Sequence, residues 1–147
     1  MGSRGAAVSV ILWVLDCSAV SAFLLAEKPG ADAVEPILTK AAAGEARILM
    51  PALFWFEVLN VLVNGERKGR LSSEQAAILR DETRHLPLET EWETGPVERR
   101  RIHELALLHR ISAYDAAYLE IAERQGSKLK SLDRDLLALK PKYPWIE

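Results

Sequence analysis

Four acidic residues of this chain stand inside or directly beside apolar segments. Asp16 follows the apolar run 10–15, Glu57 divides the run 53–59, Asp115 lies within the segment 111–119, and Asp133 follows the segment 128–132. A buried carboxylate is costly unless it is paired, protonated or bound to a cation. A shared pocket with a hard divalent cation removes that cost, because such cations prefer oxygen ligands.

Each aspartate also has a purely structural interpretation. Asp16 and Asp133 each precede an expected helix and are good N-cap residues. Asp115 follows Ser112 at the spacing of a capping box. Glu57 has the weakest structural role, because most of its neighbours along the helix are apolar. Taken together, the residue types favour one site with Asp16, Glu57, Asp115 and Asp133 as its catalytic and metal-binding residues.

The apolar pattern predicts strands and helices in alternation. The continuous run 8–15 is typical of a central parallel strand, and further strands are expected at 47–50, 86–90, 128–132 and 143–146. Helices are expected at 18–26, 31–43, 51–67, 72–85, 95–109, 112–125 and 134–139, with Pro51 in the first turn of the third. This order predicts an α/β fold in which helices cover both faces of a mostly parallel sheet. Ligands of such sheets bind beyond the carboxyl ends of the strands, where Asp16 and Asp133 are expected.

Composition limits the possible classes of protein. The chain has 147 residues, enough for a single domain over 1–147, and a net charge of −2. It is therefore not a protein that coats nucleic acid by bulk positive charge. Local basic groups at Arg67, Lys68 and Arg70, and at 99–101, remain candidates for phosphate contacts. The only cysteine, Cys17, excludes an internal disulfide and is expected to be a small buried residue.

The amino-terminal segment has some features of a signal peptide. Arg4 precedes an apolar stretch from Ala6 to Leu15. The stretch is short and runs into Asp16 without a small-residue cleavage site, so we expect the protein to be cytoplasmic and the stretch to form a buried strand. No run approaches the length needed to span a bilayer.

Four short segments resemble the motifs of PIN-domain ribonucleases, in particular the VapC toxins of bacterial toxin–antitoxin pairs. The resemblance is carried, in chain order, by the segments 14–19 (VLDCSA), 56–62 (FEVLNVL), 114–119 (YDAAYL) and 132–134 (LDR). It covers nearly the whole chain. The Glu57 helix and the segment around Asp115 are its most specific parts.

The resemblance implies a three-layer α/β/α sandwich and RNA cleavage that depends on Mg²⁺ or Mn²⁺. It also implies a homodimer and inhibition by a cognate VapB-like antitoxin. It assigns metal coordination to Asp16, Glu57, Asp115 and Asp133. Ser131 stands where the family often has Thr, which keeps the hydroxyl, and Asp135 is a second candidate near the fourth motif.

Two other classes of function fit part of the pattern. Phosphatases of the haloacid-dehalogenase type also have an aspartate after a strand, but they need a second aspartate two residues later, where this chain has Ser18. A non-catalytic binding or scaffold domain would use the acids only as helix caps. Ser18 and Ser131 are either capping hydroxyls or groups that hold the metal ligands in place.

Overall fold

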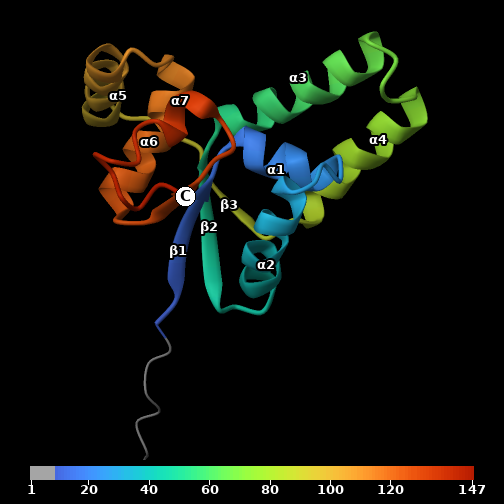
Figure 1. The fold of residues 1–147 in the computed structure, drawn as a ribbon, viewed down its shortest axis with the longest axis horizontal. Coiled ribbons are helices and arrows are strands. Elements are labelled where there is room, and N and C mark those ends of the chain that lie inside the picture. The colour runs from blue at the N-terminus through green and yellow to red at the C-terminus, as the bar shows by residue number, and fades with distance from the viewer. Residues whose placement is uncertain (1–8) are drawn as a thin grey trace, which may run out of the picture.

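The computed structural model describes residues 9–147 (Figure 1). Its sheet has four strands in the order β3-β2-β1-β4, and every neighbouring pair is parallel. The strands are β1 (Ile11–Leu15), β2 (Ala46–Pro51), β3 (Leu88–Glu91) and β4 (Lys128–Lys130). This confirms the α/β class and the parallel sheet that the sequence predicts.

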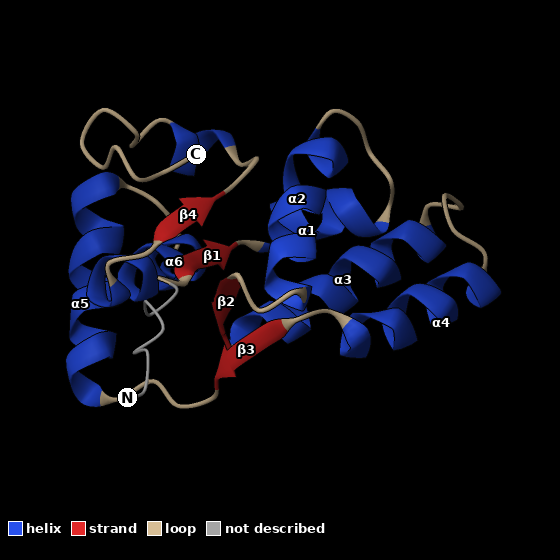
Figure 2. Cartoon of the chain, turned by 90° about the horizontal axis from the view of Figure 1, so that it is seen from below, coloured by secondary structure: helices blue, strands red, loops and turns tan. Residues whose placement is uncertain are grey.

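Helices cover both faces of the sheet, which gives the three layers expected. α1 and α2 pack on one face and α5 and α6 on the other, while α3 and α4 form a hairpin that extends beyond α1 (Figures 1 and 2). The helices are α1 (Cys17–Leu24), α2 (Gly30–Ala42), α3 (Leu53–Arg67), α4 (Ser73–Glu82), α5 (Pro96–His109), α6 (Ala113–Gln125) and α7 (Arg134–Leu137). A short 3-10 turn, Thr83–His85, follows α4. None of the described helices is both long and apolar enough to span a membrane.

β1 lies in the interior of the sheet, and its sequence explains why. Val14 and Leu15 have no exposed surface, and Val14 pairs with Leu49 on β2 and with Leu129 on β4. A strand covered on both faces needs apolar residues at successive positions, as this run has. The backbone N–H of Asp16 donates to the carbonyl of Lys130 at 3.2 Å, so β1 and β4 end side by side.

Several element boundaries differ from the predictions, and three of the differences have a clear structural outcome. The first strand begins at Ile11, and Val8 lies outside the described residues. Pro51 does not open the third helix. It ends β2, where it pairs with Glu91, and α3 begins at Leu53. The expected strand 143–146 is reduced to a single parallel bridge between Leu129 and Ile146.

Candidate metal centre

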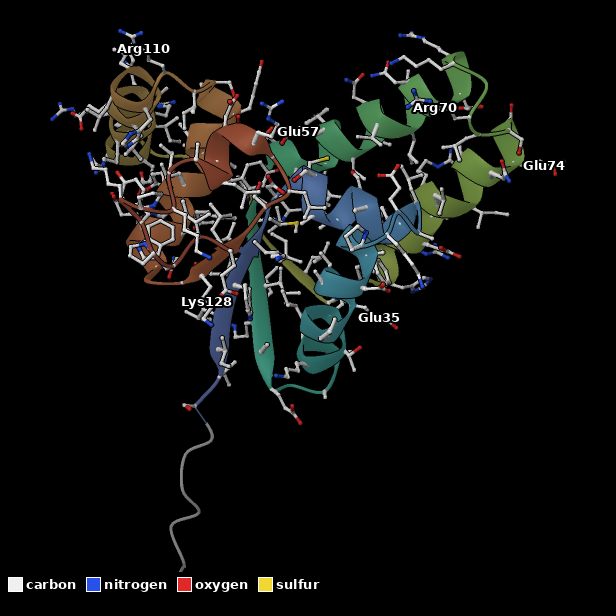
Figure 3. The ribbon with its side chains drawn as sticks, in the orientation of Figure 1. Glu35, Glu57, Arg70, Glu74, Arg110 and Lys128 are labelled. Atoms are coloured by element: carbon white, nitrogen blue, oxygen red, sulfur yellow. The ribbon has the colours of Figure 1, made fainter. Side chains whose placement is uncertain are left out.

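The predicted acids gather at the carboxyl edge of the sheet. Asp16 follows β1 and Asp133 follows β4, which is the edge where ligands of parallel sheets bind. Glu57 reaches the edge from α3, between the two helical layers (Figure 3). Asp115 is close enough to the other acids to feel their charge. Its pKa is raised first by burial and then by the negative charges of four neighbouring carboxylates: Asp133, Asp16, Glu57 and Asp135. These five acids form one acidic cluster.

Asp16 is the most buried acid of the cluster, with 3% of its surface exposed. Its Oδ1 accepts hydrogen bonds from the hydroxyl of Ser18 at 2.6 Å and the backbone N–H of Ala19 at 3.0 Å. Its Oδ2 accepts from the hydroxyl of Ser131 at 2.5 Å. Burial raises the pKa of Asp16, these hydrogen bonds oppose that rise, and the charge of Asp133 adds to it. Asp16 therefore caps α1 with Oδ1. Its second oxygen, Oδ2, faces Ser131, the residue that directly follows β4.

Two serines connect the end of β1 to the end of β4. The hydroxyl of Ser18 accepts from the backbone N–H of Leu132 at 2.9 Å, and that of Ser131 accepts from the backbone N–H of Asp133 at 2.9 Å. Each serine donates to Asp16 and accepts from the β4–α7 connection. The sequence presents capping and positioning as alternative roles for these hydroxyls, and in the structure they fix the two acid-bearing loops to each other.

Glu57 has a specific partner on the opposite helical layer. The phenol of Tyr118 donates to Oε1 of Glu57 at 2.7 Å, and Tyr118 is only 1% exposed. Burial raises the pKa of Glu57, the Tyr118 hydrogen bond lowers it, and the charge of Asp16 raises it further. The sequence pattern missed Tyr118 as a functional residue. Its position three residues after Asp115, on the same face of a helix, is the signal that could have found it.

Asp115, Asp133 and Asp135 form the open side of the cluster. Each offers one carboxylate oxygen, and these oxygens lie within 4.8 Å of one another. Asp133 caps α7 by accepting from the N–H groups of Asp135 at 2.9 Å and Leu136 at 3.2 Å with one oxygen, Oδ1.

Asp115 is the acid whose titration is most altered. It begins α6, where Ser112 accepts from its backbone N–H at 3.0 Å, but its own carboxylate accepts no hydrogen bond from a described residue. Burial first, and then the neighbouring carboxylates, raise the pKa of Asp115 to about 6. A cation would reverse the electrostatic part of this shift, so the donor set fits a hard divalent metal.

Cys17 is adjacent to Asp16 but is not a nucleophile. It is 8% exposed, and its Sγ lies 3.3 Å from the hydroxyl of Ser21. Burial and the nearby Glu57 and Asp16 charges raise the pKa of the thiol to about 11. A thiol that stays protonated is a poor nucleophile. The burial of Cys17 is as the sequence predicts.

Comparison with known proteins agrees with the fold. A family model for the PIN domain matches residues 13–141. The chain is 31% identical over 123 residues to Ribonuclease VapC3 of Pyrobaculum aerophilum, an alignment that spans 84% of this chain and 90% of that protein. The crystal structure of PAE2754 from the same organism superposes with a TM-score of 0.61 at 22% identity, over 88% of this chain and 86% of that one.

An α/β/α sandwich with a carboxylate cluster at the edge of a parallel sheet defines the class of this protein. The extent of the family match and the identity to the relative make the assignment specific: the chain belongs to the PIN domain family. The structural similarity to PAE2754 supports the fold alone.

Proposed function

We propose that this protein is a metal-dependent endoribonuclease that acts as a toxin and is held inactive by a cognate antitoxin. The observation that carries the proposal is the cluster of carboxylates at the sheet edge of a PIN-domain chain. The name of the relative, Ribonuclease VapC3, supports RNA as the substrate. A phosphatase of the haloacid-dehalogenase type lacks support, because Ser18 occupies the position of its second aspartate and only holds Asp16.

Asp16, Glu57, Asp115 and Asp133 would hold Mg²⁺ or Mn²⁺, with Asp135 assisting next to Asp133. The mutual proximity of their carboxylate oxygens supports Asp115, Asp133 and Asp135. Asp16 and Glu57 are included because their charges raise the pKa of Asp115, after burial and the charge of Asp133. A divalent ion bound there would supply polarisation of the phosphodiester and a more acidic water molecule as the nucleophile.

The residues of this chain have distinct tasks around that chemistry. Ser18 and Ser131 fix both oxygens of Asp16, and Tyr118 fixes one oxygen of Glu57. The second oxygen of Glu57 accepts no hydrogen bond from the described residues, so it is free to orient the attacking water. Asp115 must lose its proton before it can bind a cation, because a carboxylate ligand is the ionised form.

We further propose that the protein forms a homodimer and works in the cytoplasm. Exposed apolar side chains along α3, namely Phe56, Leu59 and Val63, support a subunit or antitoxin interface there. Sedimentation or light scattering of the purified chain tests the dimer.

The test of the enzymatic proposal is RNA cleavage by the purified protein. We expect cleavage with Mn²⁺ or Mg²⁺, none with EDTA, and a loss of at least 100-fold in Asp16→Asn and Asp115→Asn. Glu35→Gln removes an exposed acid on α2 and is the matched control, which should cleave normally. Full activity of Asp16→Asn or Asp115→Asn would reject the proposal, and absence of Mn²⁺ binding would favour a scaffold domain.

Growth assays test the toxin part separately. Expression of the wild type should arrest growth, and Asp16→Ala should not. Co-expression of the short reading frame next to the gene should restore growth if it encodes the antitoxin. Cleavage in vitro without growth arrest would keep the nuclease and remove the toxin assignment.

A further inference from the structure

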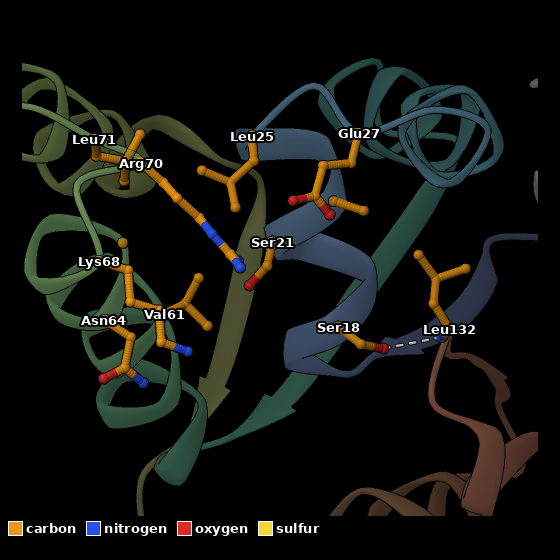
Figure 4. A pocket seen from close by; sticks show the side chains of 12 residues that line it. Ser18, Ser21, Leu25, Glu27, Val61, Asn64, Lys68, Arg70, Leu71 and Leu132 are labelled. Atoms are coloured by element: carbon orange, nitrogen blue, oxygen red, sulfur yellow. Dashed lines mark hydrogen bonds between the residues drawn. The ribbon is translucent and has the colours of Figure 1, made fainter.

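A second feature of the molecule lies beside the acidic cluster. A cavity of about 540 Å³ opens between α1 and the α3–α4 hairpin (Figure 4). Ser18 and Leu132 line its end nearest the cluster, and the hydroxyl of Ser18 bonds Asp16. Lys68 and Arg70 line it from the hairpin. The cavity is therefore separated from Asp16 of the candidate metal centre by the Ser18 side chain.

The turn between α3 and α4 places the two cations. Gly69 has φ of +71°, which lets the chain reverse directly after Lys68. The N–H groups of Arg70 and Leu71 then donate to the carbonyl of Gly65 at 2.8 and 3.1 Å. A Cβ at Gly65 would lie 2.8 Å from Cδ1 of Leu71, so the glycine permits this close return. The turn is thus well fixed, and Figure 4 shows Arg70 extending from it toward Ser21 on α1.

No ion pair within the described part of the chain explains the position of Lys68 and Arg70. Both are exposed, and neither forms an ion pair with any residue from 9 to 147. Arg101 and Arg124, by contrast, are each bound to carboxylates. The cavity also contains Glu27, which leaves one uncompensated positive charge in it. Adjacent Arg67 does not line the cavity.

We propose that Lys68 and Arg70 bind a backbone phosphate of the RNA strand outside the acidic cluster, on the α1 side of it. The inference rests on the proposed function and names a substrate subsite for it. Unpaired cations at the rim of a cavity suit phosphate oxygens, and such contacts fix the register of a strand without reading its bases. Asn64 and Ser21 supply additional polar groups in the same cavity. A protein partner could occupy the same cavity only if it brought acidic side chains to pair with Lys68 and Arg70.

Binding of RNA without cleavage tests the subsite. The probe is a fluorescein-labelled single-stranded RNA of mixed sequence, measured by anisotropy in EDTA over a range of KCl concentrations. In Lys68→Ala/Arg70→Ala we expect binding about tenfold weaker at low salt, and a slope of log K against log salt reduced by about 0.7, since each phosphate neutralised on a single strand contributes about that amount.

Lys40→Ala/Arg84→Ala is the matched control, because it removes one lysine and one arginine from exposed positions outside the cavity. It should change the affinity less than twofold. Lys68→Arg/Arg70→Lys keeps both charges and should restore binding. In the cleavage assay the alanine pair should raise KM and leave kcat unchanged.

Three results would overturn the inference: equal losses in the cavity and control pairs, no RNA binding by the wild type at low salt, or an effect of the cavity pair on antitoxin binding alone. If the protein binds RNA through Lys68 and Arg70 but does not cleave it, the nuclease proposal fails and the phosphate site remains.

Discussion

At the scale of single residues, Asp115 shows how the site stores unfavourable electrostatic energy. Its pKa is raised from 3.8 to about 6, so at neutral pH the folded protein holds a charge that burial and neighbouring acids oppose. The unfolded chain has no such penalty. The folded state therefore gains stability from protonation of Asp115, fully below pH 3.8, and loses that gain as the pH rises through 6.

Replacement of Asp115 by asparagine should therefore stabilise the metal-free protein. At pH 7 we expect a gain of about 1 kcal/mol in the free energy of unfolding, a value reduced for partial exposure of the side chain. The gain should nearly vanish at pH 4. Urea unfolding at the two pH values measures it. A variant that is less stable than wild type at pH 7 would show that Asp115 is not electrostatically strained.

The phenol of Tyr118 is a second residue with a testable role. Tyr118→Phe removes the hydrogen bond to Glu57, and we expect a loss of about 1–2 kcal/mol in stability because the acceptor is partly buried. That hydrogen bond lowers the pKa of Glu57, so the acid limb of the pH–rate profile should move to higher pH.

Tyr143→Phe is the control for Tyr118→Phe, because it removes a hydrogen bond to His109 at 2.8 Å on α5, outside the acidic cluster. It should leave the pH–rate profile unchanged. A shift of equal size in both variants would mean that the effect is not specific to Glu57.

At the scale of elements, α6 has the central position. It carries Asp115 and Tyr118 and lies against the sheet, and Arg124 near its end ties it to β3. Nε of Arg124 donates to Glu120 at 2.8 Å, and its Nη atoms donate to Glu91. Glu120 is 4% exposed, so it depends on this partner.

Arg124→Met should cost about 2–4 kcal/mol in the free energy of unfolding, because it leaves Glu120 buried without a counter-charge. Arg47→Met removes a similar two-point contact with Glu89, at 2.8 Å for both bonds, but at an exposed position. It should cost less than about 1 kcal/mol. Chemical denaturation of both variants compares them, and equal losses would contradict the role of burial.

Most elements followed from local sequence, and the exceptions have physical reasons. The helix expected from residue 72 begins with a capping box of Ser72 and Gln75, which needs only neighbouring residues. Pro51 fits both the end of a strand and the start of a helix, and pairing with Glu91 on β3 decided between them. Asp16 and Asp133 could be placed at one edge from the sequence because parallel strands deliver their following residues to the same edge. The Tyr118–Glu57 contact and the Lys68–Arg70 cavity depend on packing between layers, which periodicity does not encode.

At the scale of the whole molecule, the acidic edge lies between the two helical layers. Asp16 and Asp133 come from the sheet, Glu57 from the α1–α4 side and Asp115 from the α5–α6 side. No single element therefore contains the site. A cation held there would link both layers to the sheet, and because the unfolded chain cannot form this arrangement, binding should stabilise the whole fold.

The thermal midpoint of unfolding should accordingly rise with Mn²⁺. At a concentration about 100 times Kd the stabilisation is about 2.7 kcal/mol, which for a chain of this length raises Tm by about 5–10 °C. The rise should be lost in Asp16→Asn and Asp115→Asn and kept in Glu35→Gln. It should also shrink below pH 6, where Asp115 must release a proton to bind the cation. A wild-type Tm that does not respond to Mn²⁺, or a response that all three variants keep, would show that these carboxylates do not act as one metal centre.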